Sequence, residues 1–397
     1  MKKATRQHTK KHNRILVLRT IFDHDSISRA DIARATRLTR TTVSEIIAVL
    51  IDEGLVSEVG LGETQVGKSP ILLSLAENSR YLIGLDLAHS EFRAAIVNLR
   101  GKICTSVTKK VNDLNGEEAL ALVFETLDEL LLADYQPLVG IGVGTPGLVD
   151  SKAGIVLNAV NLDWVNLPLA KLLRDRYQLP IHLLNDSHAA AIGEYTYGEG
   201  HLSESNVVVI NARHGLGAGI MIKGQLFQGD GGGAGEIGHI VVQHAGGLHC
   251  RCGNYGCLET IASVKALLQK VQEQARLANN SLIGQTAQVS DLNMVSQAFA
   301  DGDPVVREIV LESAFYMGLA ISTLIGTLNI QKIVISGDMA IFGEPWIAAI
   351  RETFTHNTLP RLAENTQIEI GQLGKDGVLL GASAVLAKDY SSLFLQH

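Results

Sequence analysis

The 397-residue sequence predicts a two-lobed α/β protein with a winged helix-turn-helix domain at its N-terminus. A chain of this length exceeds what one hydrophobic core normally supports, so more than one domain is expected. Helical apolar patterns with a turn between them fill residues 13–50, whereas strands and helices alternate from Tyr81 onward. The predicted boundaries are 1–78 for the N-terminal domain, 79–195 for the first lobe together with a closing C-terminal helix over 383–397, and 196–382 for the second lobe.

The N-terminal domain is predicted from three short helices. Residues 13–22 carry apolar side chains at helical spacing, and Ser28 is placed to cap a second helix over 29–35. Thr39 begins a third helix after a short turn, which is the spacing of a helix-turn-helix. Arg37 stands in that turn where glycine is usual, so we expect its backbone to be left-handed at modest cost.

A wing is predicted after these helices, because residues 55–59 and 71–75 have the composition of two paired strands. A module of this kind reads base edges with the early turns of its third helix and contacts phosphates elsewhere. A three-helix module that binds another protein is the alternative. The candidate DNA contacts are Arg29, Arg40, Thr41, Thr42, Ser44 and Lys68.

The distribution of charge separates the N-terminal domain from the rest of the chain. Residues 1–50 contain 11 Lys/Arg and 4 Asp/Glu, a net charge of +7, whereas the whole chain carries −7. A basic head on an acidic body indicates that only the head meets a polyanion. A basic surface that is merely solvated is the alternative.

The compartment is predicted from what the sequence lacks. We expect no apolar run to be long enough and free enough of charge to span a bilayer, and residues 1–13 are basic and polar rather than signal-like. Only four cysteines occur in the chain, which fits a reducing environment, and Cys104 is interpreted as a core residue. A cytoplasmic protein without a membrane partner is therefore expected.

The remainder of the chain predicts two related lobes. The segments YLIGLDLAHSEFRAAIV and VVVINARHGLGAGIMIKG repeat one strand-and-glycine arrangement. The run LVGIGVG is a buried strand that enters a turn, and IHLLNDSHAAA is a strand that runs into a helix. Further helices are predicted over 117–132 and 305–328, and the second of them leads into the strand KIVISG.

A cluster of cysteines predicts a metal centre in the second lobe. Three thiolates within eight positions, with one imidazole upstream, suit the tetrahedral geometry of a structural Zn²⁺ site with no open position. Three unrelated cysteines in a loop are the alternative, and His244 and His249 are rival fourth ligands. The predicted ligands are His239, Cys250, Cys252 and Cys257.

Polar side chains gather at predicted strand ends, where open α/β sheets bind ligands. Asn185 and Asp186 follow one strand, and Glu236 and His239 follow another. Glu259 follows the cysteine loop over 250–257, called the metal loop below, and we expect this loop to place it in the same cleft. Carboxylates, an amide and an imidazole can grip vicinal hydroxyls, so we expect sugar recognition. An Asn-Asp pair after a strand could alone be a helix cap.

The chain resembles the ROK family (repressor, open reading frame, kinase), and specifically its repressors that respond to xylose, N-acetylglucosamine or glucose. The resemblance covers nearly the whole chain and rests on GTPGLVD at 144–150, NLDW at 161–164, NDSHAAAIGE at 185–194, GEIGH at 235–239 and CRCGNYGCLE at 250–259. It implies an actin/hexokinase-like (ribonuclease H-like) sugar-binding fold and the zinc ligands given above. The sugar-binding residues that it implies are Asn161, Asn185, Asp186, Glu236, His239 and Glu259.

The family also contains sugar kinases, and this chain departs from their phosphate loops. Their Asp-x-Gly-Gly-Thr reads Asp86-Leu87-Ala88-His89-Ser90 here, so two Cβ atoms and an imidazole replace the space for phosphate. His214 stands where the kinases usually have Thr, although the glycines of HGLGAG remain. A sugar-responsive repressor that does not bind ATP is expected, and a kinase with Asp186 as general base is the alternative.

The expected partners follow from this interpretation. One helix-turn-helix reads only half of a site, so a homodimer or a pair of dimers on an inverted repeat of operator DNA is expected. The other expected partners are a small sugar inducer and Zn²⁺.

Overall fold

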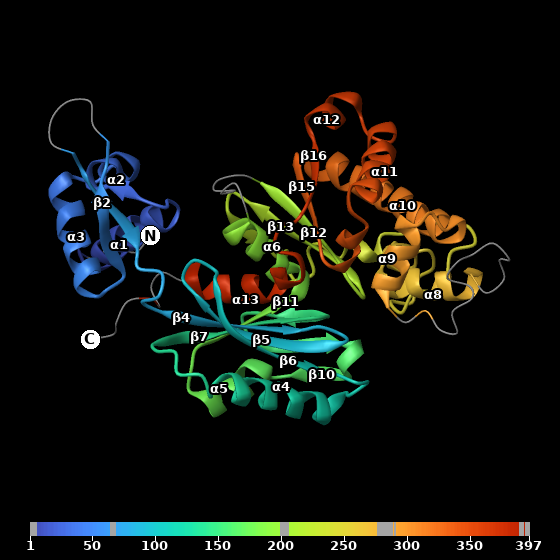
Figure 1. The fold of residues 1–397 in the computed structure, drawn as a ribbon, viewed down its shortest axis with the longest axis horizontal. Coiled ribbons are helices and arrows are strands. Elements are labelled where there is room, and N and C mark those ends of the chain that lie inside the picture. Colours follow the sequence, from blue (N-terminus) through green and yellow to red (C-terminus); the bar gives the residue numbers. More distant parts are fainter. Residues whose placement is uncertain are drawn as a thin grey trace.

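The computed structural model describes residues 6–63, 69–198, 206–275, 289, 291–388 and 393. The chain forms a small N-terminal domain and two α/β lobes, and two helices, α6 (Asp186–Tyr197) and α13 (Gly377–Lys388), lie between the sheets of the lobes (Figure 1). The predicted fold class is therefore confirmed.

The N-terminal domain is a winged helix-turn-helix, as predicted. Ser28 and Thr39 cap the second and third helices through their side-chain oxygens, and Arg37 between them is left-handed with φ 57°. The first helix begins at Arg6 rather than at residue 13. Its first turns are polar, so the apolar pattern in the sequence did not reveal them. Its elements are α1 (Arg6–Phe22), β1 (Ile27–Ser28), α2 (Arg29–Thr36), α3 (Arg40–Asp52), β2 (Val56–Leu61) and β3 (Ile71–Leu75).

Two arginines from outside this domain fasten it to the first lobe. Arg100 donates to the backbone carbonyls of Phe22 and His24 at 2.6 and 2.7 Å, where α1 ends. Arg80 donates to the carbonyl of Glu53 at 3.1 Å, immediately after α3. Each guanidinium thus satisfies carbonyls that a helix end leaves without partners.

The first lobe is built on a five-stranded sheet in the order β11-β7-β4-β5-β6. Helices α4 and α5 cover one face of this sheet, and α6 and α13 cover the other (Figure 1). A small sheet of β8, β9 and β10 follows β7. The elements are β4 (Tyr81–Leu87), β5 (Glu91–Asn98), β6 (Ile103–Lys110), α4 (Gly116–Leu130), β7 (Leu138–Thr145), β8 (Leu148–Asp150), β9 (Ile155–Ala159), η1 (Val160–Leu162), β10 (Trp164–Leu167), α5 (Leu169–Tyr177) and β11 (Ile181–Asn185).

The second lobe repeats this topology, as the two strand-and-glycine segments predict. Its sheet has the order β14-β13-β12-β15-β16, again with a three-stranded antiparallel meander beside two parallel strands. The elements are β12 (Val207–Ala212), β13 (Leu216–Ile222), β14 (Gln225–Phe227), η2 (Ile237–His239), α7 (Glu259–Ala262), α8 (Val264–Ala275), α9 (Leu292–Ala300), α10 (Pro304–Leu328), β15 (Lys332–Ser336), η4 (Asp338–Phe342), α11 (Gly343–His356), α12 (Pro360–Asn365), β16 (Gln367–Ile370) and η5 (Gly374–Asp376).

The closing helix α13 begins at Gly377, before the predicted range 383–397, and residues 389–392 and 394–397 of that range lie outside the described residues. Its first turns, assigned above to the second lobe, pack on β4 and β7 of the first lobe. Glycines permit this approach: a Cβ on Gly142 of β7 would lie 1.8 Å from the carbonyl oxygen of Ala382, and one on Gly381 would lie 1.7 Å from that of Ala189 in α6. Gly377 and Gly381 weaken the helical signal of these turns, although Val378, Leu379 and Leu380 between them are apolar and buried.

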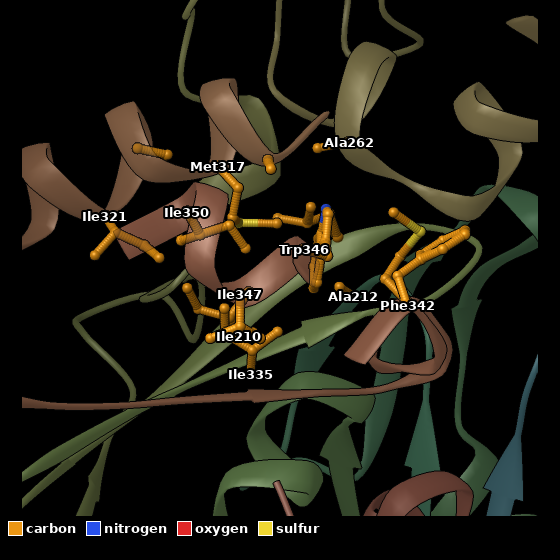
Figure 2. Packing of buried hydrophobic residues seen from close by; sticks show 14 of the residues in the cluster. Ile210, Ala212, Ala262, Met317, Ile321, Ile335, Phe342, Trp346, Ile347 and Ile350 are labelled. Atoms are coloured by element: carbon orange, nitrogen blue, oxygen red, sulfur yellow. The ribbon is translucent and has the colours of Figure 1, made fainter. Parts of the chain in front are cut away.

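The core of the second lobe surrounds Trp346, whose side chain is fully buried (Figure 2). The Trp346 indole N–H donates to the hydroxyl of Ser313 at 3.0 Å.

Helix α10 corrects the expectation that no apolar run is long enough to span a bilayer. This helix is long and apolar enough to cross a membrane, with a mean hydropathy of 1.6 in its most apolar window. Half of that window is buried. Because α10 packs against α8, α9 and α11, it serves as the central helix of this lobe.

Candidate ligand cleft and metal centre

A cleft of about 1200 Å³ lies between the lobes and is lined by strand ends from both. This volume lies above the usual range of roughly 300–1,000 Å³ for small-molecule sites. The structure brings all six residues that the family resemblance implied for sugar binding to this cleft. They are Asn161, Asn185, Asp186, Glu236, His239 and Glu259.

The first lobe contributes the junction between β11 and α6. Asn185 caps α6, because its Oδ1 accepts from the backbone N–H groups of Ser187 and His188 at 2.9 and 3.2 Å. Its Nδ2 donates to the carbonyl of Gly147 at 3.0 Å, so most of this amide is engaged in structure. Asp186 also accepts from the Ser187 N–H, at 2.7 Å through Oδ1, and burial raises its pKa although the charge of Arg213 opposes this.

The second lobe contributes two carboxylates. Glu236 precedes η2, and its pKa is raised by burial in the cleft and by the neighbouring charges of Asp186 and Glu259, against the effect of His239. Glu259 is the first residue of α7, and its Oε2 accepts from the backbone N–H of Leu216 at 3.1 Å. The cleft therefore presents hydrogen-bond acceptors from both sides to a ligand rich in hydroxyl groups.

The predicted metal ligands form one cluster. Atoms of His239, Cys250, Cys252 and Cys257 all lie within 4.8 Å of one another, and the rival histidines, His244 and His249, are not part of this cluster. The Nδ1 atom of His239 is 3.6 Å from the Cys250 sulfur, and its Nε2 is 3.9 Å from a Glu236 oxygen. The imidazole thus stands between the thiols and the cleft.

The chemistry of these four groups fits a soft divalent cation. Without a cation, burial and the two neighbouring thiols raise the pKa of Cys257 to about 12, which favours the protonated thiol. A bound metal would favour the thiolate instead, because a thiol that coordinates a metal loses its proton. Three sulfurs and one nitrogen, with no fifth ligand among the described residues of the cluster, match a closed structural site.

The metal loop also places Arg251 in the cleft, a residue that the sequence analysis did not single out. Its Nη1 donates to Asn161 Oδ1 at 2.7 Å, and its Nε lies 3.1 Å from Glu259 Oε1. Its position between Cys250 and Cys252, two of the predicted metal ligands, was the only signal in the sequence that pointed to it.

The two turns that resemble the phosphate loops of the kinases meet at the cleft through their histidines. His89 and His214 stack with ring centroids 3.6 Å apart. Burial, together with His89 and the cations Lys265 and Arg251, lowers the pKa of His214 to about 3, so this ring is neutral near pH 7. The His89 imidazole was predicted to replace space for phosphate, and in the structure it stacks on the imidazole of His214.

A buried ion pair joins the lobes beside this stack. Arg213, which follows β12, donates through Nη1 to both carboxylate oxygens of Asp86 in β4, at 3.0 and 3.1 Å. Burial alone would lower the pKa of Arg213, but the charges of Asp86, Asp338 and Asp186 raise it, so the guanidinium stays charged. Arg213 was not among the predicted site residues, although an arginine at the end of a buried strand was a visible signal in the sequence.

The predicted DNA contacts lie in the N-terminal domain and have different environments. Arg40, Thr41 and Ser44 are exposed on α3. The Thr42 hydroxyl is 2.9 Å from that of Thr39 and takes part in the cap, and Arg29 pairs with Glu58 of the wing at 2.8 Å. Lys68 lies outside the described residues.

Known proteins resemble the chain over nearly its whole length. A model described as the ROK family matches residues 82–389, and one described as winged helix-turn-helix DNA-binding matches residues 11–57. The xylose repressor of Caldicellulosiruptor bescii is 32% identical over 391 residues, which cover 96% of this chain and 97% of that protein.

Solved structures agree in fold. A ROK family transcriptional regulator, described as a homolog of the E. coli MLC protein, superposes with a TM-score of 0.83 at 28% identity and covers 97% of this chain and 98% of its own. A ROK family glucokinase from Streptomyces griseus, in complex with glucose and AMPPNP, gives a TM-score of 0.70 at 28% identity and covers 77% of this chain and 98% of its own.

Proposed function

This chain belongs to the ROK family, and we propose that it is a sugar-responsive transcriptional repressor. Its winged helix-turn-helix binds operator DNA, and a sugar bound between the lobes releases the protein from the operator. The observation that carries the proposal is that one chain joins a DNA-reading domain to a cleft lined by acceptors from both lobes. The relative from C. bescii is named a xylose repressor, which makes D-xylose the first sugar to test.

The sugar is proposed to bind through Asn161, Asp186, Glu236, His239 and Glu259. Carboxylates and amides accept hydrogen bonds from hydroxyl groups, and a polar group of the ligand left without a partner would cost binding energy. Asn185 is proposed to act mainly by holding the start of α6, since its Oδ1 already accepts two backbone N–H groups.

We propose that Zn²⁺ binds His239 and the three clustered cysteines and braces the loop that carries Glu259. Loss of the metal would free this loop and displace the carboxylate, because groups around a metal depend on it for their orientation. Zn²⁺ itself takes no part in a chemical step here.

The kinase alternative is opposed by two features. The first feature is the His89–His214 stack, which puts two imidazole rings where the kinases have the smaller Gly and Thr residues of their phosphate loops and so leaves less room for nucleotide phosphates. The second feature is Arg213, whose guanidinium already neutralises Asp86, the carboxylate that aligns with the phosphate loop of the kinases. Asp186 aligns with the general base of the kinases, but a ligand-binding carboxylate needs the same position, so its presence favours neither function.

Coupling between the cleft and the DNA is proposed to run through α6 and α13. Helix α6 begins at Asp186 in the cleft, and Tyr197 at its end packs against Gly101 beside the N-terminal domain. Leu386 and Ala387 of α13 belong to the hydrophobic cluster of the N-terminal domain. A sugar that prefers one arrangement of the lobes would thereby change DNA affinity by about 1–3 kcal/mol, and DNA would change sugar affinity by the same factor.

The proposal includes a cytoplasmic homodimer, or a pair of dimers, on an inverted repeat. The test selects operator DNA from a random pool with the full-length protein and measures its binding by fluorescence anisotropy with and without D-xylose, D-glucose or N-acetyl-D-glucosamine. We expect one sugar to weaken operator binding by roughly 5- to 150-fold. A sugar that strengthened binding would reverse the proposed sign, and sugar-dependent ATP turnover would replace the proposal with a kinase.

A further inference from the structure

Arg251 connects the two lobes through groups that the proposed function assigns to the sugar. Its Nη1 donates at 2.7 Å to Asn161 Oδ1, which belongs to η1 of the first lobe. Its Nε is 3.1 Å from Glu259 Oε1, at the start of α7 in the second lobe. One guanidinium therefore spans the cleft and ties together two side chains from opposite sides.

The backbone beneath this side chain is held in place by its loop. The Cys250 N–H donates to the carbonyl of Asn254 at 2.8 Å, and the Gly253 N–H donates to the carbonyl of Cys250 at 2.9 Å. The side chain itself is 37% exposed, in contrast to 13% for Glu259. The guanidinium is thus attached to a fixed base and remains accessible to a ligand that enters the cleft.

Arg251 contacts both oxygens of Glu259. Oε2 accepts from the Leu216 N–H at 3.1 Å and from Arg251 Nη2 at 3.4 Å, and Oε1 lies 3.1 Å from Arg251 Nε. A Cβ on Gly215 would lie 2.9 Å from Glu259 Oε2 and 3.4 Å from Arg251 Nη2, so a glycine at this position makes room for the pair. A sugar hydroxyl that donates to Asn161 Oδ1 or Glu259 Oε1 from the position of the guanidinium competes with Arg251.

We propose that Arg251 is a cross-lobe lock that holds Asn161 and Glu259 in the sugar-free protein and is displaced when the sugar binds. This inference rests on the proposed function. Arginine suits the role because its planar fork reaches two acceptors at once, whereas lysine offers a single nitrogen. Displacement breaks a direct link between the lobes, so sugar binding and lobe rearrangement become one event.

The lock also implies a criterion for the effector. Only a sugar whose hydroxyl groups reach both Asn161 and Glu259 replaces both contacts of the guanidinium. A sugar that reaches one of them leaves the other contact in place and binds without opening the lock. Arg251 is therefore a positioning residue that determines which sugar is recognised.

The test compares the full-length parent with Arg251→Gln, Arg251→Lys and the control Arg361→Gln, which changes an exposed arginine on α12. Isothermal titration measures the affinity for D-xylose, D-glucose and N-acetyl-D-glucosamine, and metal analysis confirms an intact loop. We expect Arg251→Gln to bind the preferred sugar roughly ten-fold more tightly, because a charge-assisted competitor is gone. Arg251→Lys should lie between Arg251→Gln and the parent, and the control should equal the parent.

Small-angle X-ray scattering supplies a second readout. If the lock holds the lobes, sugar-free Arg251→Gln should resemble the sugar-bound parent. Unchanged or weaker sugar binding by Arg251→Gln, with its metal retained, would overturn the lock and leave the proposed function standing. A parent that binds none of the three sugars while it binds DNA would overturn both.

Discussion

The two lobes have the same sheet topology but carry different chemistry at their strand ends. Their first hairpins, β4–β5 and β12–β13, meet at the cleft, where His89 of one turn stacks on His214 of the other. Beside this stack, Asp86 of the first lobe pairs with Arg213 of the second. The two hairpins thus contribute two imidazoles from their turns, and they contribute opposite charges from Asp86 in β4 and Arg213 after β12.

The lobes differ most in how each positions its ligand groups. In the first lobe, Asp186 is fixed by the start of a helix, which needs only backbone N–H groups and the Asn185 cap. In the second lobe, Glu259 stands two residues after Cys257 at the start of α7, so the proposed Zn²⁺ would hold it in place. The repeated sheets therefore place two sets of strand ends on opposite sides of the cleft, and the segments attached to those ends determine which ligand groups each side carries.

Removing a thiolate from the second lobe should have the largest effect. Cys257→Ser is expected to abolish metal binding and the sugar response, because Glu259 lies two residues beyond Cys257 and loses its placement. Metal analysis and a thermal-shift titration with sugar measure the two losses. Cys104→Ser in β6 of the first lobe is the control and should change neither, and a Cys257→Ser protein with full metal content would refute the ligand assignment.

Breaking the pair between the lobes should be the next largest effect. Arg213→Met leaves the Asp86 carboxylate buried without its partner, so the apparent free energy of unfolding in urea should fall by about 3–5 kcal/mol. The double variant Asp86→Leu/Arg213→Met should recover most of this loss, since it removes both charges. A single variant as stable as the parent would show that the pair does not hold the lobes together.

A change confined to the first lobe should separate ligand binding from DNA binding. Asp186→Asn keeps the shape of the side chain but removes its charge, so sugar affinity should fall by about 1.5–3 kcal/mol, while operator affinity without sugar stays unchanged. Titration calorimetry and anisotropy measure the two affinities, and Asp186→Ala should behave similarly. Equal loss in both would mean that Asp186 supports the fold, and lost sugar-dependent ATP turnover would mean that it is a catalytic base.

The smallest effect should come from the N-terminal domain, which lies outside the comparison of the lobes. Arg40→Ala should weaken operator binding by about 1–3 kcal/mol if the side chain contacts a base, with sugar affinity and metal content unchanged. Lys10→Ala, at an exposed position on α1, should instead mainly reduce the salt dependence. Operator binding by Arg40→Ala equal to that of the parent would remove Arg40 from the DNA contacts.

Local patterns in the sequence determined much of this protein. The caps Ser28 and Thr39, the left-handed Arg37 and the repeated strand-and-glycine segments each specify a nearby conformation, and the structure confirms them. The metal cluster was predictable for the same reason, since three of its ligands lie within eight positions. The spacing of residues along the chain is enough to predict such features, because the groups that form each of them lie close together in the sequence.

Contacts between residues far apart in the chain were decided only by the tertiary structure. Arg213 meets Asp86 across 127 positions and Arg251 meets Asn161 across 90, and no periodicity links such pairs. The start of α13 escaped prediction because Gly381 of α13 packs closely on α6 and Gly142 of β7 packs closely on α13, a requirement that exists only once those elements are assembled. The sequence by itself thus determined the elements and the ligand types, whereas the folded chain decided which charges meet, because that depends on how the lobes face each other.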